Sequence, residues 1–164
     1  MFEIKATNLH WMGTLDEPLD LCLHGDAWAR IGDESFEFKN ATVSATAFYL
    51  LRSLTQDHVM YQMPTQLLPC CGHDMRIWKG ELIICGCPNG IDWSVIHENG
   101  QVKLITESQK ETVLSLDEYR ETVFAFADEI EAFYKNSKEK AFECKEDQET
   151  YPIFWEEWRK RRYS

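Results

Sequence analysis

Positive charge is scarce in this sequence. Lys and Arg number 17 against 28 Asp and Glu, which gives the 164 residues a formal net charge of −11. Because nucleic-acid binding depends on neutralising phosphate charge, this composition argues against DNA or RNA as a partner, and equally against anionic membrane surfaces. The partner that such a surface would attract is a basic protein.

Long apolar runs are also missing. Glu3, Lys5 and Asn8 interrupt the N-terminal segment, where a signal peptide would be continuously apolar. No run approaches the roughly 20 residues that a membrane-spanning helix needs. We therefore expect a cytoplasmic protein with reduced cysteines. The chain length and the 44% hydrophobic content predict a single domain over residues 1–164 with a core of its own.

Familiar catalytic motifs are absent from the sequence. There is no H-E-x-x-H, no G-x-S-x-G, no phosphate-binding G-x-x-x-x-G-K-[ST] and no G-x-G-x-x-G after a strand. The histidines are scattered along the chain, at His10, His24, His58, His73 and His97. These absences favour a non-catalytic protein, although an enzyme of unrecognised type stays an alternative.

The stretch 81–106 carries the clearest structural signals. Asn99-Gly100 predicts a two-residue hairpin turn of type I′, because both central residues of that turn need positive φ. The turn sets Glu98 opposite Gln101 and Val95 opposite Leu104. One face of this hairpin is then apolar, and a shift of one residue would invert the sorting.

A second turn signal precedes this hairpin. Pro88-Asn89-Gly90 combines a residue that presets φ with residues that accept the left-handed conformation. We expect Leu82–Cys87 to pair back on Ile91–Ile96. The result would be a three-stranded antiparallel meander with one buried face, followed by a short strand over Thr112–Leu114.

The N-terminal third predicts further strands. Phe2–Met12 and Leu19–His24 both alternate apolar with polar residues, and Gly25-Asp26 and Gly32-Asp33-Glu34 are turn signals. A two-residue turn at Gly25-Asp26 would set apolar residues opposite polar ones. A longer loop or a bulge would be needed to repair that register.

The spacing of apolar residues along the chain predicts three helices. Asn40–Thr55 reads as a short amphipathic helix with Thr42 as its N-cap, and Ser115 with Glu118 forms a capping box at the start of a longer helix. Residues 136–149 read as a linker, and a last helix begins at Thr150 with Pro152 in its first turn. The expected fold is α+β, an antiparallel meander sheet packed by about three helices.

One group of residues could bind a metal. Zinc takes four soft or borderline ligands in a tetrahedron, often two from each of two chain segments. Here C-C-x-H is followed by C-x-C, and the candidate ligands are Cys70, Cys71, His73, Cys85 and Cys87. The usual C-x(2–4)-C spacing is not met, and cysteine also packs in cores as a small hydrophobe, so both interpretations stay open.

Three functional hypotheses follow from these features. The first is a small, acidic, non-catalytic module that binds a protein partner, preferably a basic one, and inhibits it. Bacterial immunity proteins that neutralise secreted toxins are similar in size and charge, although no motif residue can be matched. The second is a zinc-stabilised domain that uses the cysteines above. The third is the enzyme of unrecognised type, with a site between sheet and helices.

Overall fold

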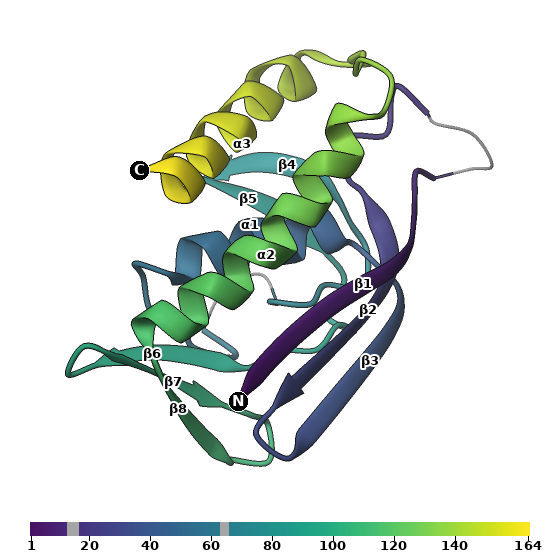
Figure 1. Ribbon diagram of the computed structural model, residues 1–164. Coiled ribbons are helices and arrows are strands. Elements are labelled where there is room, and N and C mark those ends of the chain that lie inside the picture. The colour runs from purple at the N-terminus through teal and green to yellow at the C-terminus, as the bar shows by residue number, and fades with distance from the viewer. Residues whose placement is uncertain (13–16, 63–65) are drawn as a thin grey trace.

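The computed structural model describes residues 1–12, 17–62 and 66–164, with the backbone alone at residue 73. Within these residues, three helices and eight strands form an α+β fold whose strands make three small antiparallel sheets (Figure 1). The strands are β1 (Phe2–His10), β2 (His24–Ile31), β3 (Glu34–Ala41), β4 (Gly72–Trp78), β5 (Glu81–Gly86), β6 (Ser94–Glu98), β7 (Gln101–Ile105) and β8 (Glu111–Ser115). The helices are α1 (Val43–Ser53), α2 (Leu116–Lys135) and α3 (Lys145–Tyr163).

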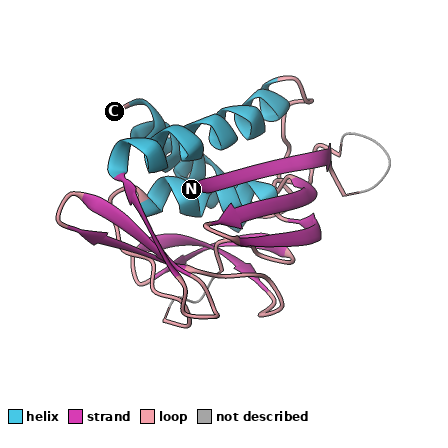
Figure 2. Ribbon diagram, turned by 60° about the horizontal axis from the view of Figure 1, so that its bottom comes forward, coloured by secondary structure: helices cyan, strands magenta, loops and turns pink. Residues whose placement is uncertain are grey.

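The predicted fold class is confirmed, but the strands divide among three sheets rather than one. The sheets are β1-β2-β3, β4-β5 and β6-β7-β8. Figure 2 shows the helices gathered along one side of the strands. A single apolar core joins these parts, and its largest fully buried side chains include Trp93, Trp158, Tyr119, Phe48 and Phe154.

The first sheet corrects the N-terminal prediction. Leu19–His24 is not a strand, and Gly25-Asp26 is not a turn, because both residues lie inside β2. Gly25 pairs with Ala41 and Asp26 with Thr7. The register conflict noted in the sequence therefore disappears. The turn expected over Gly32-Asp33-Glu34 is present but is two residues long, since Ile31 pairs directly with Glu34, which belongs to β3.

Helix α1 lies behind α2 in the view of Figure 1 and is buried along its whole length. The helix expected over Asn40–Thr55 is confirmed over Val43–Ser53, but the exposed polar face expected of an amphipathic helix is not present. Polar side chains tolerate this burial because they are hydrogen-bonded. Ser44 Oγ accepts the Leu23 N–H at 2.9 Å, and the Tyr49 hydroxyl both accepts from and donates to the backbone of Ile84.

The pairing expected between Leu82–Cys87 and Ile91–Ile96 is also wrong. Strand β5 pairs with β4 instead, across a turn in which Lys79 and Gly80 have φ of 50° and 82°. Glycine accepts this left-handed conformation freely, whereas lysine gives no such signal in a sequence. After the Pro88-Asn89-Gly90 bend, Ile91 exchanges two backbone hydrogen bonds with Leu68.

The Asn99-Gly100 hairpin is confirmed in detail. Strands β6 and β7 pair with Glu98 opposite Gln101 and Val95 opposite Leu104. Trp93 and Val95 are fully buried, as the alternation requires. The short strand predicted over Thr112–Leu114 is β8, and it completes the meander on the side of β7.

The last two helices confirm one boundary and correct another. Ser115 and Glu118 make the predicted capping box at the start of α2. Helix α3 begins at Lys145, so the irregular segment is 136–144 rather than 136–149, and Pro152 lies in the helix interior rather than in its first turn. The first turn of α3 contains only polar residues, so the spacing of apolar residues that predicts a helix is missing there. No helix among the described residues is long and apolar enough to cross a membrane.

Candidate metal centre

Three cysteines meet where the β4–β5 hairpin begins and ends. The pairing of Gly72 with Gly86 brings the residues just before β4 next to those just after β5. Cys70 and Cys71 come from the first segment and Cys87 from the second. Their three Sγ atoms lie within 4.8 Å of one another, and all three residues are half-buried.

Thr42, the residue before α1, holds the first of these segments in place. Its backbone N–H donates to the Pro69 carbonyl at 3.1 Å, and its Oγ1 accepts the Gly72 N–H at 2.7 Å. These two hydrogen bonds bracket Cys70 and Cys71. Thr42 precedes α1 as predicted, but its side chain makes no capping hydrogen bond, because it serves the cysteine segment instead.

Gly86 allows the second segment to approach. A Cβ at this position would overlap the backbone oxygen of Cys71. Only glycine has no such atom, so the end of β5 can lie directly against the residues before β4. The β4–β5 register shifts between Gly72 and Asp74, which places a bulge at the same end of the hairpin.

Hydrogen bonding among the sulfur atoms makes the Cys87 thiol more acidic and the Cys70 thiol less acidic. The Sγ atoms of Cys70 and Cys87 are hydrogen-bonded, 2.9 Å apart. The bond with Cys70, then the bond with Cys71 and the Asn89 N–H, lower the pKa of Cys87 to about 7. The bond with Cys87 raises the pKa of Cys70 to about 12. A thiolate at neutral pH is the form in which cysteine binds metals.

The structure therefore brings together some of the predicted ligands and not others. Cys70, Cys71 and Cys87 form the cluster, whereas Cys85 lies outside it. Because β5 ends at Gly86, the alternation of side chains along that strand does not extend from Cys85 to Cys87. The side chain of His73 lies outside the described part of the structure.

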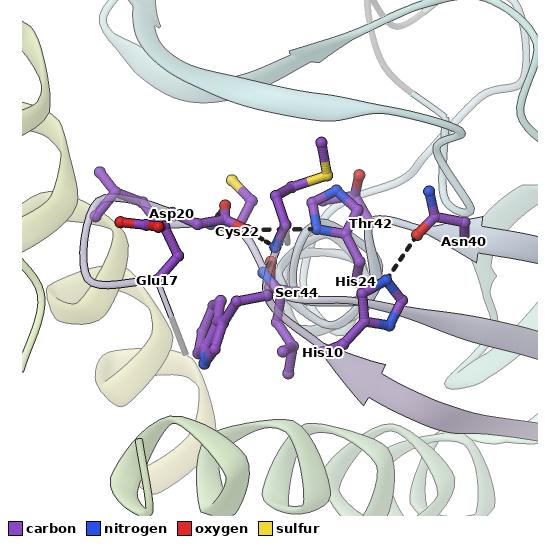
Figure 3. A network of polar contacts seen from close by, with 12 residues as sticks. His10, Glu17, Asp20, Cys22, His24, Asn40, Thr42 and Ser44 are labelled. Atoms are coloured by element: carbon purple, nitrogen blue, oxygen red, sulfur yellow. Dashed lines mark hydrogen bonds and ion pairs between the residues drawn. The ribbon is translucent and has the colours of Figure 1, made fainter. Parts of the chain in front are cut away.

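Cys22 belongs to a different environment, which Figure 3 shows. It is buried beside the start of α1, where Asp20 accepts the Cys22 N–H and Ser44 accepts the next N–H along the chain. Burial, followed by the nearby charge of Asp20, raises the pKa of the Cys22 thiol far above its usual range. A thiol that keeps its proton neither attacks nor binds metal, so Cys22 is a core residue.

Two histidine–aspartate pairs were not anticipated from the sequence. His58 Nε2 donates to Asp92 at 2.8 Å, and the same carboxylate oxygen accepts the Leu67 N–H. His97 donates to Asp57 through both its ring and its backbone N–H, and these bonds hold the pKa of Asp57 below its usual range. The partners are far apart in sequence, so no local signal exists. Both pairs hold the segment after α1 against β6 and against the residues just before that strand.

Among the described residues, the three thiols are the one group of His, Cys, Asp and Glu side chains close enough together to hold a metal ion. Comparisons with protein-family models, curated proteins and solved structures find no match for this chain. Any functional conclusion therefore depends on the chemistry of the side chains themselves.

Proposed function

We propose that this protein binds zinc through Cys70, Cys71 and Cys87, and that the metal fastens the segment before β4 to the segment after β5. The observation that carries the proposal is the meeting of three thiols, from two chain segments, within 4.8 Å. Zinc–thiolate bonds of about 2.3 Å in a tetrahedron separate the sulfur atoms by about 3.8 Å. Small side-chain rotations would bring the cluster to that spacing.

The metal has a structural role in this proposal. Structural zinc sites have four protein ligands, whereas catalytic sites keep one position for water. The fourth ligand that we propose is the imidazole of His73, because it follows Cys71 by two residues and a tetrahedron needs one more donor. A His73→Ala variant that binds zinc with unchanged affinity would show that His73 is not the fourth ligand.

Metal analysis of the protein, purified under reducing conditions without added zinc, tests the proposal. We expect about one zinc per chain, loss of zinc from Cys87→Ser, and full retention by Cys144→Ser, because Cys144 is exposed and outside the cluster. At a zinc concentration 100 times the Kd, binding stabilises the fold by about 2.7 kcal/mol. Chelation should therefore lower the Tm by about 5–10 °C.

The opposite results have a defined meaning. Sub-stoichiometric zinc together with an unchanged Tm on chelation contradicts the proposal. The close approach of Cys70 and Cys87 would then indicate that these two residues form a disulfide. Mass spectrometry distinguishes the two, because oxidation to a disulfide removes two hydrogen atoms and leaves Cys71 free to react with an alkylating reagent.

A second candidate function is the binding and inhibition of a basic protein. It is favoured by the outer face of α2, whose exposed acidic side chains are Asp117, Glu118, Glu121, Asp128 and Glu129. Arg120 pairs with Asp117 and Arg162 with Asp128. Glu121 and Glu129 have no ion-pair partner among the described residues, so their charge is available to a partner.

Charge reversal on this face tests the second candidate. A basic protein captured from the native cell extract at low salt should be identified, purified and titrated against the chain. Glu121→Lys combined with Glu129→Lys should weaken that binding at least tenfold, because like charges then face the partner. Glu37→Lys combined with Glu81→Lys, at exposed positions of β3 and β5, reverses the same number of charges and should have little effect. Equal losses in both variants would indicate a non-specific charge effect.

A further inference from the structure

A pocket of about 430 Å³ lies between the C-terminal turn of α2, the segment 136–144 and α3. Its volume falls within the range typical of small-molecule sites. It shares no lining residue with the cysteine cluster or with the exposed acidic face of α2.

Aromatic side chains form one wall of this pocket. The rings of Tyr134 and Trp155 meet edge to face, with centroids 4.9 Å apart and planes at 86°. Tyr151 stands at 90° to Trp155, and Phe142 lies 5.7 Å from Tyr151. Perpendicular packing of this kind fixes the orientation of each ring. The pocket therefore has a wall of aromatic rings whose orientations are fixed by their neighbours.

Charged side chains, most of them cationic, form much of the rest of the lining, although the whole chain has a net charge of −11. Lys135, Lys138, Lys140 and Arg159 line the pocket, against the carboxylates Glu131 and Glu139. Arg159 has no hydrogen-bond or ion-pair partner within the described part of the chain. Its guanidinium is therefore available to an anion, which it can bind with two parallel hydrogen bonds.

The carboxylate of Glu131 does not cancel this charge for a ligand. It accepts from Lys135 Nζ at 2.7 Å, from Trp158 Nε1 at 3.1 Å and from the Tyr163 hydroxyl at 2.8 Å. These three donors occupy the carboxylate and neutralise it locally. The pocket thus combines an aromatic wall with the uncompensated charge of Arg159.

We propose that this pocket binds a nucleoside monophosphate, with the base against the aromatic wall and the phosphate at Arg159. Stacking of bases on aromatic side chains and bidentate binding of phosphate by arginine are the two interactions that the lining offers. A polynucleotide is disfavoured, because the acidity of the whole chain repels a polyanion. A mononucleotide brings one phosphate and one base, which matches the two parts of the pocket.

Calorimetric titration of the full chain with AMP, adenosine and ribose 5-phosphate tests the proposal. We expect AMP to bind with a Kd below 1 mM, and the two fragments to bind at least tenfold more weakly, because each contacts only one part of the lining. Trp155 should report the same event as a change in tryptophan fluorescence. Binding should be unchanged after chelation, so failure of the zinc proposal would not affect this result.

Two variants of α3 provide a matched pair. Arg159→Gln should weaken AMP binding at least tenfold, whereas Lys160→Gln should leave it unchanged, because Lys160 lines a different pocket beside the end of α1. Tyr151→Leu should also weaken binding, with its Tm measured to separate binding from unfolding. The proposal is overturned if AMP does not bind at 5 mM, a range in which even weak specific sites are occupied. The proposal is equally overturned if adenosine or ribose 5-phosphate binds as tightly as AMP. The same holds if Lys160→Gln loses as much affinity for AMP as Arg159→Gln.

Discussion

At the scale of single residues, the environment of each cysteine sets its chemistry. Cys22 is buried and keeps its proton, Cys144 is exposed, and Cys85 lies on β5 outside the cluster. Cys70 and Cys87 share a hydrogen bond, with Cys71 beside them. Residue type alone does not distinguish these six thiols, whereas their burial and neighbours do.

Zinc should therefore protect some cysteines from alkylation and not others. With zinc bound, we expect Cys70, Cys71 and Cys87 to resist iodoacetamide, because metal-bound thiolates are less available for attack, and to react once a chelator is added. Cys85 and Cys144 should react at the same rate in both states, and Cys22 in neither. Peptide mapping by mass spectrometry measures each site. Protection of Cys85 by zinc would show that the ligand set differs from the one proposed.

Thr42 is a second residue whose contribution can be isolated. Thr42→Val keeps the shape of the side chain but removes the acceptor for the Gly72 N–H, which is buried. An unsatisfied buried donor costs about 1–3 kcal/mol. We expect that loss in urea unfolding, together with weaker zinc binding. Thr42→Ser keeps the hydroxyl and should lose less than half as much, and equal losses in both variants would mean that the hydroxyl is not the cause.

At the scale of elements, the β4–β5 hairpin depends on contacts from outside itself. An isolated two-stranded hairpin is marginal in water. Here the Tyr49 hydroxyl of α1 satisfies both the N–H and the carbonyl of Ile84 in β5. Arg52 of α1 donates to the Leu82 carbonyl of the same strand. Helix α1 thus supports β5 in the role that a third strand would otherwise take.

Substitution of two glycines in this hairpin distinguishes the effect of close approach from the effect of backbone conformation. Gly86→Ala should reduce zinc affinity at least tenfold, because the new methyl group displaces the end of β5 from Cys71. Gly80→Ala meets no atom within 4 Å but imposes a left-handed φ of 82° on alanine, at a cost of about 1 kcal/mol. Its zinc affinity should be unchanged. Zinc titration with a competing chelator measures both, and a similar loss in Gly80→Ala would refute the close-approach explanation.

At the scale of the whole molecule, one ion pair joins three elements. Arg52 of α1 donates to Glu157 of α3 through Nε and Nη2, each at 2.8 Å, and Nη2 also reaches the Leu82 carbonyl of β5. Burial alone would raise the pKa of Glu157, but the bonds from Arg52 and then Arg161 outweigh it and hold that pKa below its usual value of 4.5. The pair therefore anchors α3 to the core as long as Glu157 is ionised.

Glu157→Gln should destabilise the protein by about 3 kcal/mol at pH 7, because it leaves the charge of Arg52 buried without its partner. The folded-state pKa of Glu157 is lower than that of the unfolded chain, so its contribution is complete above about pH 4.5 and is lost as the pH falls through the folded-state value. The difference between wild type and variant in urea unfolding should shrink accordingly below pH 4. Glu156→Gln, at the exposed neighbouring position, should differ from wild type by less than about 0.5 kcal/mol at every pH. A pH-independent loss in Glu157→Gln would contradict the ionic explanation.

The predictions that the structure confirms concern neighbouring residues. The register of the Asn99-Gly100 hairpin, the Gly32-Asp33 turn and the capping box of Ser115 with Glu118 were all predictable. In the candidate site, three of the five proposed ligands come together. The partner of β5 and the exclusion of Cys85 were not predictable, because they depend on a segment distant in the chain and on a strand boundary. The start of α3 at Lys145 was missed because its first turn is polar.

The sequence by itself determined the α+β character, the local turns and caps, and the net negative charge. These follow from φ preferences, side-chain periodicity and charge, which act within a few residues or as a sum over the chain. The tertiary structure alone decided that α1 is buried along its whole length, that Thr42 and Gly86 bring Cys70, Cys71 and Cys87 together, and that cations line the aromatic pocket beside α3. Such meetings depend on packing between distant segments, for which a sequence contains no local signal.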